Sequence, residues 1–461
     1  MRSKAWLGLN RRWKVVAVSA AGIFFPVALQ AAGFEKPVMF SGKWAPLGGA
    51  ASAGVRGAES VYFNPAGLGG ISGKDVVVDA SPTAAQFSGP VATETIETSE
   101  QTLSPVAGAF FATALTDRLG FGLGVYSSAG ANSSYQDLDF TGAQQGLSSD
   151  ESSLVDVSNY SDAFDLLKPD IGTELKFIEF SPALGFKLSD SLRVGVAWRA
   201  MLVSGALHSA KVKEAASPVN AVLVNALLGD LSGTSLSGWR AGLQFTPSDD
   251  FGLGLSVRGP MAFTLEGTTS GLVEAGSQSW PEVYDLQEGE VTAKTSLPLQ
   301  ASAGAFVKVG SHWTLFPEYT YTQYSSNQKI ELSGSVILPD ELTGEEVELS
   351  DLMLEWKDQH SAKLGVQYDW SDSVALRAGY VYTTAVTPAD RSRATSSAPG
   401  VTQTVTMGVG FSNLGWGFGI EGVNLGAEYT TLSGEGTNEL GVSGKFSNTF
   451  MAVHTALQFK F

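Results

Sequence analysis

The chain ends in Met451-Ala-Val-His-Thr-Ala-Leu-Gln-Phe-Lys-Phe461, a stretch that alternates between apolar and polar residues. The apolar positions are Met451, Val453, Leu457, Phe459 and Phe461, and the polar positions between them include His454, Gln458 and Lys460. A period of two residues, apolar outward and polar inward, is typical of transmembrane β-barrel strands. A soluble β-sandwich would alternate in the same way, but it would seldom carry the pattern to a C-terminal Phe.

The same alternation recurs upstream and predicts an all-β transmembrane fold, a 14-stranded antiparallel outer-membrane β-barrel. The predicted strands lie near residues 74–89, 104–116, 118–130, 174–187, 191–206, 237–246, 251–267, 291–308, 312–332, 354–369, 373–386, 402–411, 421–431 and 446–461. Tight turns, as at 188–191 and 247–250, alternate with longer loops that are acidic and rich in Ser and Gly. In outer-membrane barrels the short turns face the periplasm, so both ends of the barrel should lie on that side.

The inward face of the predicted strands carries charged residues. They are Lys187, Arg193, Arg199, Arg240, Arg258, Glu318, Lys363, Arg377, Glu428 and Lys460. Charges at these positions indicate a polar lumen and exclude an apolar core.

Residues 1–31 have the build of a cleaved signal peptide: a basic start, an apolar run over 15–29, and small residues at 31–33. An N-terminal membrane anchor is the alternative, but the apolar run is shorter than the roughly 20 residues a bilayer requires. No later apolar run approaches that length, so membrane residence must come from strands. We therefore expect a multi-pass β-barrel in the bacterial outer membrane.

The composition limits the chemistry that the chain can perform. It contains 53 Gly and only 16% charged residues. It contains no Cys, so a disulfide framework or a thiolate metal site is excluded. The formal charge of −17 becomes about −22 without the leader, which has five basic and no acidic residues, and so nucleic acid is not an expected partner. No residue spacing indicates a metal loop, and we expect neither a metal nor a cofactor.

Residues 32–73 do not alternate and are rich in Gly and Ala. A segment at the periplasmic end with nowhere else to pack is best placed inside the barrel, as an N-terminal plug or hatch. The alternative is a disordered periplasmic tail. The predicted domains are thus a signal peptide (1–31), a hatch (32–73) and the barrel (74–461).

Several motifs resemble the FadL/TodX-like family of outer-membrane transporters of long-chain fatty acids and other hydrophobic compounds. The stretches that carry the resemblance are Ala32-Gly33-Phe34, Gly48–Gly54, Tyr62-Phe-Asn-Pro-Ala-Gly-Leu68, Asp117–Gly124, Phe180–Asp190 and Trp356–Gly365. The resemblance covers essentially the whole mature chain. It implies ligand capture by outer loops, an interior pocket, hatch rearrangement and sideways exit near the third strand.

The resemblance also nominates residues for gating and binding. Phe34, at the start of the mature chain, becomes a candidate ligand contact. Asn64, Pro65 and Ala66 become gating candidates, although Asn-Pro often simply starts a turn. A further set of gating candidates lies on the inner face of the third strand and comprises Gly120, Gly122 and Gly124. Glycine there admits a bend or another backbone, or merely relieves crowding against the plug.

Two long loops, 208–235 and 269–290, are candidates for ligand capture. Residues 218–228 predict a short amphipathic helix, because their apolar residues recur at helical spacing. Its candidate ligand contacts are Val222, Leu223 and Leu227. The second loop offers an apolar partner that includes Trp280 and Tyr284, and the alternative is that the two loops simply pack together as a lid.

Arg199, Arg240 and Arg258 lie seven or eight residues from the nearest turn on three adjacent predicted strands. With inward parity they should form a basic belt near mid-height. Guanidinium groups present paired donors that suit a ligand carboxylate. A structural network with Glu318, Glu428 or acids of the plug is the alternative, and Lys363 should pair with Glu318.

Taken together, these features predict passive uptake of hydrophobic molecules, with long-chain fatty acids favoured, by a monomer that has no enzymatic activity. The expected partners are a fatty acid or another apolar small molecule, outer-membrane lipid and lipopolysaccharide, and the barrel assembly machinery. A general aqueous porin and a membrane-embedded phospholipid hydrolase are the competing functions. The four His residues are too scattered in sequence to nominate a hydrolase site.

Overall fold

The structure is a computed structural model. It describes residues 35–461 except 141–144, 148–153, 157–163, 165, 215–220, 276–281, 341–343, 345 and 417–418. The signal peptide, Phe34 and Trp280 therefore lie outside the described residues. Within the described part of the chain, no helix is long and apolar enough to cross a bilayer.

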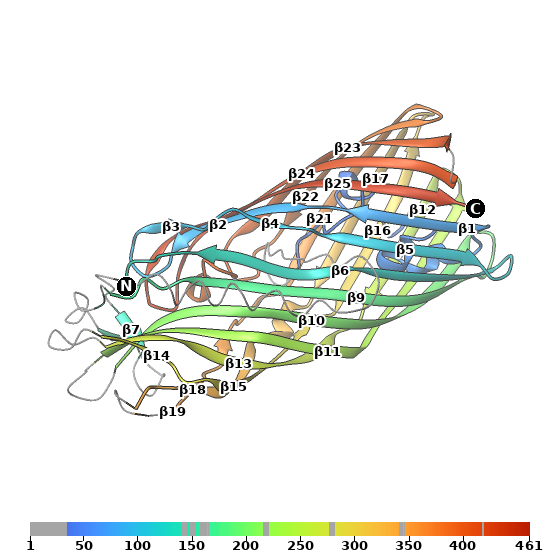
Figure 1. Cartoon of the computed structure of the whole chain (residues 1–461). Helices are drawn as coiled ribbons and strands as arrows, with labels where there is room; N and C mark the ends of the chain where they lie inside the picture. Colours follow the sequence, from blue (N-terminus) through green and yellow to red (C-terminus); the bar gives the residue numbers. More distant parts are fainter. Residues whose placement is uncertain are drawn as a thin grey trace.

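The strands close into a 14-stranded antiparallel β-barrel, as predicted (Figure 1). Several barrel strands consist of two pieces. Around the wall they are β1 (Lys74–Ala80) with β2 (Thr83–Pro90), β4 (Thr102–Ser104) with β5 (Ala107–Ala114), β6 (Leu119–Tyr135), β9 (Ile171–Lys187), β10 (Leu192–Glu214), β11 (Ala221–Ser248), β12 (Phe251–Arg258) with β13 (Met261–Ala275), β16 (Gln300–Val309) with β15 (Gly289–Leu297), β17 (Trp313–Thr322) with β18 (Lys329–Ile337), β21 (Gln359–Ser371), β22 (Val374–Thr383), β23 (Val401–Trp416), β24 (Ile420–Thr437) and β25 (Ser443–Lys460). Short strands in the loops are β3 (Ile96–Thr98), β7 (Gln145–Leu147), β8 (Leu154–Asp156), β14 (Val283–Asp285), β19 (Glu346–Glu348) and β20 (Leu352–Met353).

The barrel closes where the last strand meets the first. Strand β25 pairs antiparallel with β1, and Val77 lies opposite Gln458. Lys74 and Phe461 exchange two backbone hydrogen bonds, of 2.9 and 3.0 Å. The closure predicted from the C-terminal stretch is therefore confirmed, and it leaves no open sheet edge at this seam.

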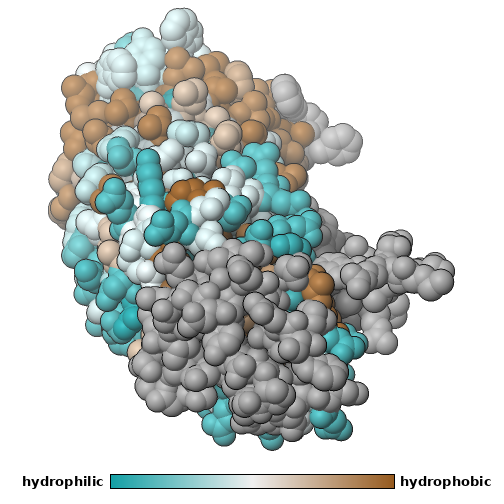
Figure 2. Space-filling model, turned by 90° about the vertical axis from the view of Figure 1, so that its left-hand side faces the viewer, coloured by the Kyte–Doolittle hydropathy of each residue, from teal (hydrophilic) through white to brown (hydrophobic). Residues whose placement is uncertain are grey.

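The wall is inverted relative to a soluble protein. In β25, Met451 and Val453 are 50% and 58% exposed, whereas the alternate residues Ala452 and His454 are buried, at 4% and 0%. Figure 2, viewed from the loop end, shows hydrophilic residues around that end and hydrophobic residues over the wall behind it. Apolar side chains therefore face lipid, and polar side chains face the lumen.

The segment from residue 35 to residue 69 is almost entirely buried and contacts the inner side of the wall. In Figure 1 it is the blue coil enclosed by strands. It contains three short helices: η2 (Ala45–Leu47), α2 (Ser60–Phe63) and η3 (Pro65–Leu68). Its backbone lies so close to the wall that several facing wall positions have no room for a side chain. At Gly195, for example, a Cβ would lie 2.2 Å from the carbonyl carbon of Pro65. Wall glycines that likewise face the backbone of this segment are Gly120, Gly185, Gly254, Gly365 and Gly379, and those that face its side chains are Gly122, Gly242, Gly408 and Gly426.

The helix predicted within residues 218–228 is wrong. Residues from Ala221 onward belong to β11, which pairs with β10 on one side (Leu223 with Val212) and with β13 on the other (Val222 with Ala275). The spacing of the apolar residues is compatible with either an amphipathic helix or a β-strand. Two ladders of hydrogen bonds and burial of both faces favour the strand.

Candidate functional site

Two cavities of opposite character lie among the described residues of the lumen. The first, about 740 Å³ of space that is partly open to solvent, lies toward the loop end and is walled by β9, β10, β11, β13, β15, β18 and by residues before β21. Its lining is Thr173, Leu175, Phe177, Leu207, Leu228, Leu231, Phe263, Leu265, Ala293, Thr295, Ile330, Leu332, Leu352, Leu354, Trp356, Ser396 and Ser397. None of these residues is ionisable, so we call this space the apolar cavity.

Inward alternation on several strands builds the apolar cavity, and aromatic pairs make its wall rigid. Phe177 of β9 meets Phe263 of β13 edge-on, with ring centroids 5.5 Å apart. Tyr324 and Trp356 form a second edge-on pair at 5.4 Å. Such pairs add to the stabilisation from apolar burial.

A loop between β22 and β23 covers part of the apolar cavity through Ser396 and Ser397. Arg393 of this loop donates a hydrogen bond of 2.9 Å to the carbonyl oxygen of Met353. Arg391 forms an ion pair of 2.6 Å with Glu355. Both contacts join the loop to the chain segment that carries Leu352 and Leu354, so the two loops cover the cavity together.

The second cavity, of about 850 Å³, lies beside the buried segment 35–69 and is polar. We call it the polar cavity. Six charged side chains line it: Glu35, Lys36, Arg240, Arg258, Glu318 and Lys363. Ser, Thr and Gln residues of β12, β16, β17 and β21 complete the wall side.

The three arginines of the predicted basic belt do lie on neighbouring strands and face inward. Arg240 and Arg258 are direct cross-strand partners, and Arg199 sits on β10 opposite Gly238 of β11. All three are buried. Because each is buried, each needs a hydrogen-bond or charge partner, and those partners differ.

Arg199 is paired with the wall itself. Its Nε and Nη2 donate hydrogen bonds of 2.7 and 2.5 Å to the two carboxylate oxygens of Glu179 on β9. Glu179 is also held by the hydroxyls of Tyr126 and Ser181. Both partners belong to barrel strands, so this pair is fixed to the scaffold.

Arg240 and Arg258 are paired with the buried segment. Arg240 donates to the backbone oxygen of Val61 at 2.9 Å, and its guanidinium lies 5.1 Å from the ring centre of Tyr62. Arg258 forms a two-pronged ion pair with the carboxylate of Glu35. Of the acids considered in the alternative network, only an acid of the buried segment, Glu35, pairs with the belt. Glu318 and Glu428 pair with Lys363 and Lys36 instead, and the wall acid Glu179, which pairs with Arg199, was not predicted.

The predicted pair of Lys363 and Glu318 is confirmed, with a distance of 3.0 Å between Nζ and the carboxylate. The other carboxylate oxygen of Glu318 accepts a hydrogen bond of 2.8 Å from the backbone N–H of Ser52. The same acid thus joins two barrel strands and the buried segment.

Asn64, Pro65 and Ala66 lie where the buried segment touches β10, β11 and β12. The Asn64 side chain caps η3 by accepting from the N–H of Ala66 at 3.1 Å. Its amide nitrogen donates to the backbone oxygen of Ser52 at 2.7 Å and reaches the oxygens of Leu243 and Leu255. One side chain therefore connects the segment to two strands.

Gly120, Gly122 and Gly124 lie on β6 and face inward. Added Cβ atoms would meet Leu68 at Gly120 and Val61 at Gly122, both in the buried segment. These positions pair with both neighbouring strands without interruption, and the irregularity of β6 comes later, between Ser127 and Ala129. The contacts favour close approach of another backbone over a bend at the glycines.

The two predicted capture loops do contact each other. Val222 of β11 and Tyr284 of β14 belong to one apolar cluster, together with Val273, Leu286, Val336 and Leu338. Leu223 faces the other side and is fully buried in the main cluster. Leu227 is half-buried on that same face. Because the segment is a strand, the three nominated residues divide between two surfaces.

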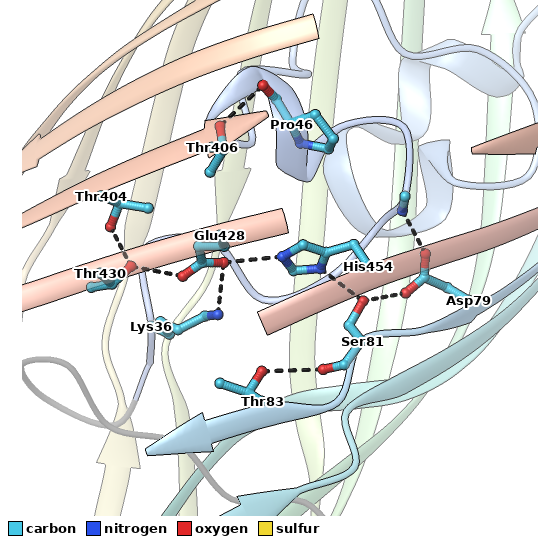
Figure 3. Close-up of polar contacts among 11 residues, drawn as sticks. Lys36, Pro46, Asp79, Ser81, Thr83, Thr404, Thr406, Glu428, Thr430 and His454 are labelled. Atoms are coloured by element: carbon cyan, nitrogen blue, oxygen red, sulfur yellow. Dashed lines mark hydrogen bonds and ion pairs between the residues drawn. The ribbon is translucent and has the colours of Figure 1, made fainter. Parts of the chain in front are cut away.

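Sequence reasoning missed a chain of hydrogen bonds that ties the buried segment to the seam of the barrel (Figure 3). His454 bonds Ser81 at 2.9 Å and Glu428 at 3.1 Å, and Glu428 pairs with Lys36 at 2.8 Å. Beyond Ser81, the carboxylate of Asp79 accepts from Ser81 and from the N–H of Gly42. No local signal predicts it, because Lys36 and Glu428 are 392 positions apart.

The group of Ser81, His454 and Glu428 superficially resembles the set of side chains in a serine hydrolase. All three are enclosed, and the Ser81 hydroxyl donates to Asp79. Their role is therefore to anchor the buried segment. Among the described residues, no three His, Asp or Glu side chains cluster so as to hold a metal ion.

The fold and the lumen define the class of the molecule: an outer-membrane β-barrel whose interior is filled by its own N-terminal segment. The sequence matches the family model described as outer membrane protein transport protein (OMPP1/FadL/TodX) over residues 157–414. The chain belongs to this family of outer-membrane transporters of hydrophobic compounds, and it is not an enzyme. Among curated proteins, none matches the sequence closely enough to count as a relative.

Solved structures show the same fold at low sequence identity. A FadL homologue from Pseudomonas aeruginosa is 15% identical, with a TM-score of 0.71 over 93% of this chain and 100% of that one. The toluene transporter TodX of Pseudomonas putida is 16% identical, with a TM-score of 0.67 over 94% and 100%. The toluene transporter TbuX of Ralstonia pickettii is 15% identical, with a TM-score of 0.60 over 90% and 98%.

Proposed function

We propose that this transporter takes up long-chain fatty acids through the apolar cavity. The observation that carries the proposal is the apolar cavity itself, whose described lining residues include no ionisable side chain. Apolar surface of this kind binds hydrocarbon chains because burial releases them from water. The toluene transporters of similar fold suggest aromatic hydrocarbons as the competing substrate class.

The proposed route begins at the outer loops. The apolar cluster that includes Val222 and Tyr284 supports capture of the molecule outside the membrane, with Leu223, Leu227, Trp280 and Phe34 as further contacts. From there the molecule enters the apolar cavity. Residues 32–73 act as the hatch, in which Asn64, Pro65 and Ala66 set the closed position.

Exit is proposed to be sideways into the membrane, near β6. The β5–β6 ladder ends at the pair Gly108 and Tyr126. Beyond it, β6 carries its irregularity at Ser128, and the links to the preceding strand are isolated contacts such as Glu100 N–H to Ser134 O at 2.9 Å. A wall held by few ladder hydrogen bonds opens at lower cost than a fully paired one.

A fatty acid also needs a partner for its carboxylate, and the basic belt supplies candidates. The cavity-lining residue Phe263 is five residues beyond Arg258 along the same barrel strand, or about 16 Å at roughly 3.3 Å per residue. Met261, between them, is buried and apolar. A long acyl chain could therefore lie in the apolar cavity while its carboxylate reaches the belt.

The test compares oleate with 1-octadecene, an uncharged hydrocarbon of the same length. Binding of both to the purified wild-type barrel in lipid nanodiscs is expected, and binding of neither would overturn the proposal. Replacing Arg258 by Gln should weaken oleate binding by about ten- to a hundredfold, because a charge-assisted hydrogen bond contributes roughly 1.5 to 3 kcal/mol. Binding of 1-octadecene should not change. Equal loss for both ligands would assign the arginine to the wall network and favour an uncharged substrate.

The proposal also includes the surroundings of the barrel. Its exposed apolar wall fits outer-membrane lipid, its loops fit the lipopolysaccharide layer, and its C-terminal Phe461, 68% exposed, is available to the barrel assembly machinery. The seam is closed by a ladder between two strands of the same chain, which supports a monomer.

A further inference from the structure

The pairs Arg258–Glu35 and Arg199–Glu179 have the same chemistry but different attachments. In both, a buried guanidinium holds both oxygens of one carboxylate. Glu179 lies within β9, where strand pairing fixes it on both sides. Glu35 lies outside any helix or strand and pairs with no strand of the wall. Only the carboxylate of Glu35 can leave its arginine without breaking the wall.

The surroundings of the two pairs also differ. Among the described residues that line the polar cavity, Arg258 and Glu35 are both present and Arg199 is not. A displaced Glu35 carboxylate would move into a cavity that already contains hydrogen-bond donors such as Lys363 and Gln300. Each guanidinium also has one buried nitrogen without a hydrogen-bond partner among the described residues, Nε in Arg258 and Nη1 in Arg199, but only that of Arg258 belongs to a residue that lines the polar cavity. The Arg258 guanidinium therefore has an unused donor in addition to the two held by Glu35.

Glu35 is followed directly by Lys36, which is anchored elsewhere. Lys36 pairs with Glu428 of β24 at 2.8 Å, and both side chains are fully buried. Residues 35 and 36 thus form a strap that joins β12 to β24, strands that no ladder connects. Release of Glu35 would free one end of this strap and leave the other end attached.

Building on the proposed function, we infer that the Glu35 carboxylate occupies the position at Arg258 that a ligand carboxylate takes when the ligand binds. An incoming fatty acid exchanges its carboxylate for that of Glu35, so the charge at the guanidinium stays balanced. The exchange releases the Glu35 end of the strap from β12, so the N-terminal end of the hatch can move. The ligand class is an apolar chain with one carboxylate, and an uncharged molecule binds in the apolar cavity without releasing the strap. Glu35 is the residue that couples occupancy to hatch movement.

The first test measures binding of oleate and of oleyl alcohol, which has the same chain without the charge. The Glu35→Gln variant removes the competing charge, so we expect it to bind oleate about tenfold more tightly than wild type does. Oleyl alcohol should bind both proteins alike. The control is Glu179→Gln, which changes an equivalent ion pair in the wall and should leave oleate affinity unchanged. Unchanged oleate affinity in Glu35→Gln, or an equal gain in Glu179→Gln, would overturn the inference.

A second test needs no change at Glu35. The chain contains no Cys, so Pro37→Cys places a single thiol next to the strap. Its reaction with a polar maleimide should become faster when oleate is present and stay constant with oleyl alcohol. If oleate binds and the thiol does not respond, or if both ligands act alike, the exchange is refuted. Binding of neither ligand to wild type would instead refute the proposed function.

Discussion

The apolar cavity and the polar cavity are similar in size, about 740 and 850 Å³, but they impose opposite demands on a ligand. The apolar cavity is built from wall strands and loops, and its lining holds no ionisable residue. The polar cavity borders the hatch and holds six charged residues, most of them paired. The difference teaches that the wall and loops offer a surface suited to a hydrocarbon chain, whereas the charged groups of the lumen gather where residues 35–69 meet the wall.

Deletion of residues 35–69 should have the largest effect on this comparison. It removes one side of the polar cavity and leaves the ladders of the wall intact, because those ladders pair strands only with strands. The result should be a folded barrel that conducts ions, since its lumen is polar. Single-channel recordings in planar bilayers measure this. If the truncated barrel conducts no better than the intact chain, residues 35–69 do not block the pore.

The next largest effect concerns the ion pair between Lys36 and Glu428, which attaches residues 35–69 to β24. Lys36→Met leaves the buried Glu428 without its ion pair and should reduce the stability of the hatch by about 3 to 5 kcal/mol. Protease accessibility of the N-terminal segment, titrated with urea, reports this loss. Lys329→Met is the matched control, because Lys329 pairs with Asp351 at 2.7 Å on the surface, where a salt bridge contributes at most about 1 kcal/mol. Equal effects of the two variants would contradict the role of the Lys36 anchor.

A polar group in the apolar cavity should weaken all ligands equally. Leu265→Asn keeps a similar volume at a buried lining position and should reduce the affinity for both oleate and 1-octadecene by about tenfold or more, given the value of burying one apolar side chain. Thr320→Val in the polar cavity is the control and should leave 1-octadecene binding unchanged. A loss for oleate alone in Leu265→Asn would mean that the chain binds elsewhere.

The smallest effect concerns Gly195 of β10, where the wall contacts the backbone of residues 35–69. At Gly195 an added Cβ would lie 2.2 Å from the backbone of Pro65, so Gly195→Ala should cost about 1 kcal/mol through overpacking. Brief conductance bursts should become more frequent. Gly229→Ala is the control, because its Cβ would make an ordinary contact of 3.5 Å. Identical recordings from the two variants would show that the hatch is not seated on Gly195.

Several predictions from the sequence were correct because they depend on local patterns. The barrel strands follow from alternation with a period of two, which each segment displays by itself. The inward parity of Arg199, Arg240 and Arg258 follows from the same count. The pairing of Lys363 with Glu318 followed from estimating their heights on neighbouring strands, and the structure confirms it at 3.0 Å.

Other predictions failed, or were impossible, because the deciding interactions are distant in sequence. Residues 221–228 satisfy the spacing of an amphipathic helix, yet β10 and β13 supply ladders on both sides and make them a strand. Likewise, no local pattern indicates that Ser81, His454 and Glu428 form one buried hydrogen-bonded chain.

The sequence by itself therefore determined the barrel and the inward direction of the three arginines of the basic belt, because strand geometry repeats every two residues. Only the tertiary structure decided which acid each arginine meets. Arg199 meets Glu179, 20 positions away, and Arg258 meets Glu35, 223 positions away. A buried charge pairs with whichever opposite charge the closed fold places beside it. For Arg258, that partner depends on the path that residues 35–69 take through the lumen.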